Sequence, residues 1–110
     1  MSAFTDVVEK SMAQANELGL GIDETLMTAV AKGLGPSIYN QDSASVACSD
    51  QEELDRVKKN FLLGKLGLAD GPELDAALAE TCAAMKAVNR KSRVVFYAYL
   101  VKKFGKENIY

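Results

Sequence analysis

Apolar residues recur along this chain at the spacing of helices. Between residues 50 and 65, and again between 71 and 87, they fall three or four positions apart, so that each set lines one face of a helix. The first set consists of Leu54, Val57, Phe61 and Leu62, and the second of Leu74, Ala77, Leu78, Thr81 and Met85, with Val88 directly after the range. Alternation of apolar and polar residues, as in a strand, does not extend over any useful length. The pattern predicts helices over residues 5–18, 23–32, 50–65, 71–87 and 92–104.

Polar residues that can cap a helix mark the predicted starts. Ser49, followed three residues later by Glu52, has the spacing of a capping box. Asp70 precedes a Gly-Pro-Glu sequence, which supplies a cap and places proline in the first turn. Asp23 and Thr5 are weaker cap candidates.

Glycines mark the predicted helix ends. Gly19, Gly33 and Gly67 each follow a helical stretch and are each followed by leucine. A glycine at this position takes the left-handed conformation at low cost, and the next apolar residue can fold back on the last turn. Gly105 is a fourth stop, after two lysines that suit the negative end of a helix.

The predicted helix over 92–104 is apolar nearly all round. One face carries Val94, Tyr97, Leu100, Val101 and Phe104, and Val95, Phe96, Ala98 and Tyr99 cover much of the rest. Such a helix lies either in the centre of its own fold or in a contact with a partner subunit. Its β-branched and aromatic residues also suit a strand, but the helical spacing and the following glycine favour a helix.

Residues 34–49 form the main irregular stretch, rich in turn-forming residues. A loop of this length in a compact domain requires either a function or packing of its own. We therefore take Tyr39, Asp42 and Cys48 as the candidate loop site.

Length and composition indicate one globular domain over residues 1–110, with 48% hydrophobic and 25% charged residues. The predicted fold class is all-α: a compact single-domain bundle of about five helices with one longer loop. The longest apolar run, residues 94–101, is far shorter than the roughly 20 residues of a membrane span. No secretory signal is visible at the N-terminus, so we expect a soluble cytoplasmic protein with no membrane association.

The formal net charge of −2 hides an asymmetry between the two halves of the chain. Residues 1–55 carry ten acidic and two basic side chains, whereas residues 56–110 carry eleven basic and five acidic ones. This polarity can steer an anionic partner, or it can reflect pairing between packed halves. We favour internal pairing.

The residue types needed for common catalytic and metal sites are scarce. The chain has no histidine and two cysteines, which leaves neither a triad base nor four zinc ligands. Cys48 is either a reactive thiol or, more commonly for such a residue, buried and inert, and Cys82 is expected in the core. The Gly-Leu-Gly sequences at 19–21 and 33–35 lack the strand–turn–helix context of a phosphate loop. We therefore predict no catalytic residue, cofactor or metal site, and favour a non-enzyme.

A basic junction precedes the last predicted helix and is the candidate interaction surface. It comprises Lys86, Arg90, Lys91 and Arg93, with Tyr97 and Tyr99 after them. These cations could contact phosphates while the tyrosines stack on bases. They could equally form a solvated helix junction, and the overall acidity is untypical of a nucleic-acid-binding protein.

Several stretches resemble a family of short bacterial proteins, catalogued as domain of unknown function 2853. They are residues 32–39 (Lys-Gly-Leu-Gly-Pro-Ser-Ile-Tyr), 42–43, 46–50, 57–62, 65–68 and 96–104. The resemblance extends from about residue 28 to the end and is firmest over Cys48–Leu68. It implies a bacterial, cytoplasmic, helical protein, and it implies no activity, cofactor or catalytic residue.

Three functions follow as hypotheses, of which we favour the first and keep the other two as alternatives. The first is a non-enzymatic helical protein that acts through protein contacts, with a homodimer through the 92–104 helix as its specific form. The second is a nucleic-acid-binding protein that uses the basic junction. The third is a small-molecule binder or enzyme that uses the 34–49 loop.

Overall fold

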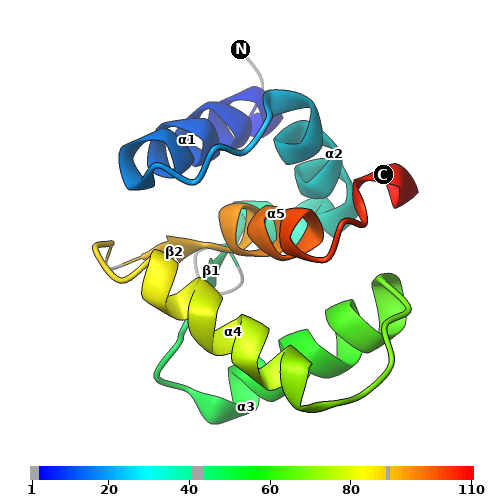
Figure 1. The fold of residues 1–110 in the computed structure, drawn as a ribbon. Coiled ribbons are helices and arrows are strands. Elements are labelled where there is room, and N and C mark those ends of the chain that lie inside the picture. The colour runs from blue at the N-terminus through cyan, green and yellow to red at the C-terminus, as the bar shows by residue number, and fades with distance from the viewer. Residues whose placement is uncertain (1–2, 41–43, 89) are drawn as a thin grey trace.

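The computed structural model describes residues 3–40, 44–88 and 90–110, which form three helical layers (Figure 1). Its α-helices are α1 (Ala3–Leu18), α2 (Glu24–Leu34), α3 (Gln51–Arg56), α4 (Pro72–Ala84) and α5 (Arg93–Lys103). The remaining elements are the 3-10 helices η1 (Gly35–Tyr39) and η3 (Glu107–Ile109), the π-helix η2 (Val57–Lys65), and the strands β1 (Ser45–Val46) and β2 (Lys91–Ser92). Helices α1 and α2 pack on one side of α5, and α3, η2 and α4 form the layer on its other side. The all-α prediction is confirmed.

Helix α5 is the centre of the hydrophobic core. Its buried residues are Val94, Val95, Phe96, Tyr97, Ala98, Leu100 and Val101. Because α5 is covered from both sides, it needs apolar residues around most of its circumference. The all-round apolarity is therefore explained within one chain. The homodimer through this helix stays a prediction, without the exposed apolar face that motivated it.

The helix ends agree with the predicted stops in three places and differ in one. Gly19, Gly67 and Gly105 have φ of 68°, 65° and 65°, as expected of glycines that end helices. The second predicted helix, however, continues through Gly33 to Leu34, and Gly35 is its cap, with φ of 68°. Either glycine of the Gly-Leu-Gly sequence could serve as the stop, and the later one is used.

The helix starts show three corrections, the first being that Thr5 lies inside α1 and not before it. Asp23 caps α2 as predicted, since its side chain accepts a hydrogen bond from the Thr25 amide. Helix α3 is capped by Asp50 instead of Ser49, through the Glu52 amide. At α4 the cap position is Gly71, and Asp70 instead forms an ion pair with Lys58. At α3 and α4 the cap therefore lies one residue later than predicted.

The predicted helix over 50–65 changes its winding after its first six residues. Residues 51–56 are α-helical, and 57–65 form the π-helix η2. The hydrogen bond from the Leu66 amide to the Phe61 carbonyl, 2.8 Å long, shows the i→i−5 pattern at its end. Val57, Phe61 and Leu62 are nevertheless buried, as the apolar spacing predicted.

The predicted 34–49 loop contains η1 and β1. Strand β1 pairs antiparallel with β2, with Ser45 opposite Ser92 and Val46 opposite Lys91. These short strands were not predicted, because two residues carry no recognisable alternation. Together they form a ribbon that brackets residues 47–90.

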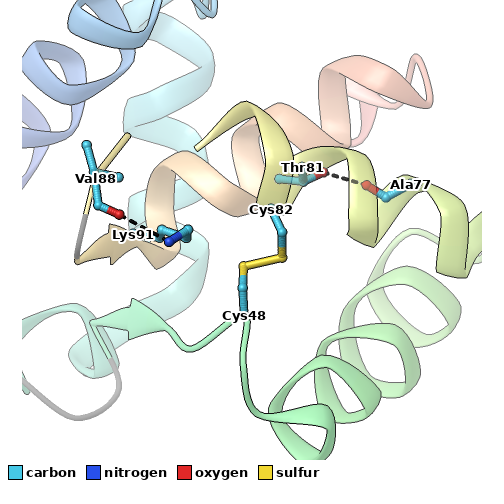
Figure 2. Close-up of a disulfide and its surroundings, with 6 residues drawn as sticks. All are labelled: Cys48, Ala77, Thr81, Cys82, Val88 and Lys91. Atoms are coloured by element: carbon cyan, nitrogen blue, oxygen red, sulfur yellow. Dashed lines mark hydrogen bonds between the residues drawn. A yellow bond between two sulfur atoms is a disulfide. The ribbon is translucent and has the colours of Figure 1, made fainter. Parts of the chain in front are cut away.

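Cys48 and Cys82 form a disulfide between the segment before α3 and the end of α4, with 5.9 Å between their Cα atoms (Figure 2). This corrects two expectations. Cys48 is neither a reactive thiol nor an inert free one, and Cys82 is partly exposed instead of fully buried in the core. The two thiols are 34 positions apart in sequence, so only the packing of the α3–α4 layer reveals that they meet.

Candidate functional site

A pocket of about 310 Å³ lies between α1, η1 and the β-ribbon. Its polar lining comprises Lys10, Ser11, Gln14, Tyr39, Ser45, Arg90 and Ser92. Thus Tyr39 of the predicted loop site and Arg90 of the predicted basic junction line the same pocket. Small-molecule pockets in proteins generally start at about 300 Å³, so this one suits a small ligand.

The wall between α1 and β2 is fixed by one glutamine side chain. The side-chain Nε2 of Gln14 donates to the Arg90 backbone carbonyl at 3.0 Å, and its Oε1 accepts from the Ser92 backbone amide, also at 3.0 Å. These two bonds hold the backbone around β2 against α1. Gln14 thereby positions Arg90 and Ser92 at the pocket, although they lie 76 and 78 positions later in the sequence, respectively.

Two serine hydroxyls meet beneath this wall. Ser11 is only 2% exposed, and its Oγ lies 3.4 Å from Ser92 Oγ. That separation is longer than the usual 2.5–3.0 Å of a hydroxyl–hydroxyl hydrogen bond. Ser92 Oγ also accepts from the Val95 amide at 3.3 Å, as the cap of α5. The contact between the two hydroxyls is therefore a long hydrogen bond.

Two cations, Lys10 and Arg90, give the pocket its charge. Both residues are exposed. Among the residues that the structure describes, neither side chain has a carboxylate within ion-pair distance, and no acidic residue lines the pocket. The described part of the pocket is therefore positively charged, on a protein whose net charge is negative.

A second pocket, of about 330 Å³, lies between the start of α2 and the C-terminal segment. Its lining includes Leu26, Ala29, Lys102 and Tyr110. Lys102 is the cation among its described lining residues, and its Nζ already donates to the Gly21 carbonyl at 2.6 Å. This pocket is similar in size to the first, but the ammonium of Lys102 is already hydrogen-bonded to the backbone.

The predicted basic junction is divided between surface and interior. Lys86 and Arg90 are exposed, whereas the Lys91 ammonium donates to the Val88 carbonyl at 3.1 Å (Figure 2). Arg93 forms an ion pair with Glu53, and these side chains are only 13% and 14% exposed. Arg93 therefore ties α5 to α3, and the exposed part of the junction is reduced to two cations. Nucleic-acid binding stays a prediction.

The two tyrosines of the junction differ in burial. Tyr97 is buried, stacks on Phe61 with ring centroids 4.0 Å apart, and accepts a hydrogen bond from Arg93 Nη1 at 2.9 Å. Burial raises the pKa of its phenol above 10.0, although the adjacent guanidinium of Arg93 lowers it in part. Tyr99 is partly buried. The packing of Tyr97 in the core leaves its ring unavailable for base stacking.

The three residues of the predicted loop site do not gather in one place among the described residues. Tyr39 lies at the pocket and is 51% exposed. Cys48 is in the disulfide and does not line the pocket among the described residues. Asp42 lies outside the residues that the structure describes.

The sequence alone did not point to the pocket residues on α1. Lys10, Ser11 and Gln14 occupy one side of the predicted 5–18 helix, together with Val7. Their spacing of three or four residues could have marked a common face. It does not reveal what the face packs against.

The arrangement defines a small all-α protein with a cationic pocket at the edge of a helical core. A family model described as "Protein of unknown function (DUF2853)" matches residues 9–108, and the chain belongs to this family. A comparison with curated proteins finds no match. Among the described residues, no helix is both long and apolar enough to cross a membrane. Within the same residues, no three His, Cys, Asp or Glu side chains gather as a metal site.

Proposed function

We propose that this protein is a binding module for a small anionic ligand with a phosphate or carboxylate group, held in the pocket between α1 and the β-ribbon. The observation that carries the proposal is the pair of cations, Lys10 and Arg90, that line this pocket without an ion-pair partner among the described residues. The proposal follows the third hypothesis drawn from the sequence, a small-molecule binder. It takes Arg90 from the basic junction of the second hypothesis.

The chemistry of the pocket fits an oxyanion. A guanidinium can donate two parallel hydrogen bonds to a carboxylate or phosphate, and an ammonium adds a compact positive charge. The Ser11 and Ser92 hydroxyls, with their long 3.4 Å contact, supply further donors to the same oxygens. Tyr39, half exposed beside them, offers an aromatic face to the remainder of the ligand.

Inorganic phosphate is a suitable first probe because it contains only the oxyanion. In a ¹H–¹⁵N NMR titration at low ionic strength, amide signals of residues 10–14, 44–46 and 90–92 should shift. Arg90→Ala and Lys10→Ala should each weaken phosphate binding about tenfold, which corresponds to 1.4 kcal/mol. Added NaCl should weaken binding by the wild type more than binding by either variant.

Lys86→Ala is the matched control, since Lys86 is exposed, lies near Arg90 in sequence and does not line the pocket. It should bind phosphate like the wild type. A titration without shifts at the pocket up to tens of millimolar phosphate would overturn the proposal. An equal loss of affinity in all three variants would also contradict it, because it would indicate general charge attraction.

A further inference from the structure

The disulfide lies close to one wall of the proposed pocket. Strand β1 ends at Val46, and Cys48 follows two residues later, before α3 begins. Ser45 of the same strand lines the pocket. The disulfide thus anchors the far end of the segment that forms this wall to α4 (Figure 2).

Non-covalent contacts hold β1 from the other side. The Arg93 amide donates to the Ala44 carbonyl at 2.8 Å, and Arg93 Nη2 donates to the Ser45 carbonyl at 3.3 Å. The pairing of β1 with β2 completes this side. Each of these contacts can open in a local fluctuation, whereas the disulfide cannot open without a chemical reaction.

Neither cysteine is fully buried. Both are partly exposed residues packed against the hydrophobic core. Disulfides in reducing compartments are generally transient or regulatory, whereas those in oxidising compartments persist. A partly exposed disulfide next to a ligand pocket therefore offers a means of control.

We propose that the Cys48–Cys82 disulfide is a redox switch for the pocket, an inference that rests on the proposed anion-binding function. A dithiol reductant attacks one of the two sulfurs as a thiolate, the S–S bond breaks, and a mixed disulfide forms. The second thiol of the reductant then releases the protein. Two electrons and two protons pass to Cys48 and Cys82, and the dithiol becomes a disulfide. Released from α4, the segment that follows β1 becomes mobile, the Ser45 wall loosens, and the pocket holds its anion less firmly.

The test compares air-oxidised wild type, wild type reduced with dithiothreitol, and the double variant Cys48→Ser with Cys82→Ser. Phosphate affinity is measured by NMR titration, and backbone mobility by the ¹⁵N heteronuclear NOE. Reduced wild type and the double variant should bind phosphate at least about fivefold more weakly than oxidised wild type. The NOE should fall at residues 44–48 and stay constant in α5. The double variant should not respond to dithiothreitol, which controls for other effects of the reagent.

The outcomes separate this inference from the function on which it rests. Equal phosphate binding and equal NOE values in the oxidised and reduced proteins overturn the switch and leave the anion pocket intact. Absence of phosphate binding by the oxidised protein overturns the proposed function, and the switch as stated with it. If reduction removes the native dispersion of α5 signals, the disulfide is a structural crosslink and the switch is refuted. Two alkylatable thiols in the air-oxidised protein would also refute it. Reduced wild type provides the comparison if the double variant does not fold.

Discussion

Replacing Cys48 and Cys82 together by serine removes the covalent link across the α3–α4 layer while nearly preserving side-chain size. In the chain-entropy account, a crosslink stabilises the fold by restricting the unfolded chain, and its effect grows with the logarithm of the closed loop. A separation of 34 residues corresponds to about 3.8 kcal/mol at 25 °C. A chain of 110 residues unfolds with an entropy of about 0.23 kcal/mol/K. The melting temperature should therefore fall by ~16 °C.

Thermal and urea denaturation, followed by circular dichroism at 222 nm, would measure this loss. Reduced wild type should match the double variant, and dithiothreitol should leave the variant unchanged. The dependence of unfolding free energy on urea should become steeper without the crosslink, because the unfolded chain exposes more surface. A melting temperature that shifts by less than about 2 °C on complete reduction would refute the reasoning, because it would show that the crosslink does not restrict the unfolded chain.

Two further predictions concern α5 and the C-terminus. Arg93→Met should lower the free energy of unfolding by about 3 kcal/mol in urea denaturation, because Glu53 loses its largely buried partner and, among the described residues, keeps an ion pair with the exposed Arg56 alone. Adding Glu53→Leu should recover part of this loss, and a double variant no more stable than the single one would contradict the expectation. Burial, and to a lesser degree Tyr97, raises the pKa of Tyr110 from 10.0 to about 12. The unfolded chain therefore releases this proton at lower pH than the folded protein, so the stability should fall as pH rises from 10 to 12, and less so in Tyr110→Phe. Urea denaturation at pH 9, 10 and 11 measures both proteins, and identical pH dependence would count against this assignment.

A helix end is predicted accurately where a single residue can cap the free backbone groups of the helix. It is predicted less accurately where neighbouring residues could both do so. Asp23 stood alone before its helix and was identified correctly. Ser49 and Asp50 are adjacent and both accept hydrogen bonds, so the sequence did not distinguish them. The same ambiguity applied to Gly33 and Gly35. At these two places the errors are of one or two residues, because the competing groups are neighbours.

The candidate site was predicted only in part, because its members come from distant segments. Tyr39 and Arg90 were selected for separate reasons, and the fold brings both to one pocket. Arg93 was selected as a surface cation, yet it pairs with Glu53, 40 positions earlier. The favoured pairing of the acidic and basic halves therefore holds at this contact. Other ion pairs between described residues, such as Lys58–Asp75 and Lys103–Glu80, join residues within the basic half.

The sequence by itself determined the helical class, the approximate helix boundaries and the buried faces of the helices. These depend on apolar spacing and on capping groups within about five residues of one another, and such local relations are visible in the order of the residues. The tertiary structure alone decided that α5 is central, that Cys48 meets Cys82, and that Lys10 and Arg90 line one pocket. Each of these depends on the directions in which helices cross and on which faces cover one another. Many distant residues set those relations together, so no single stretch of the sequence contains them.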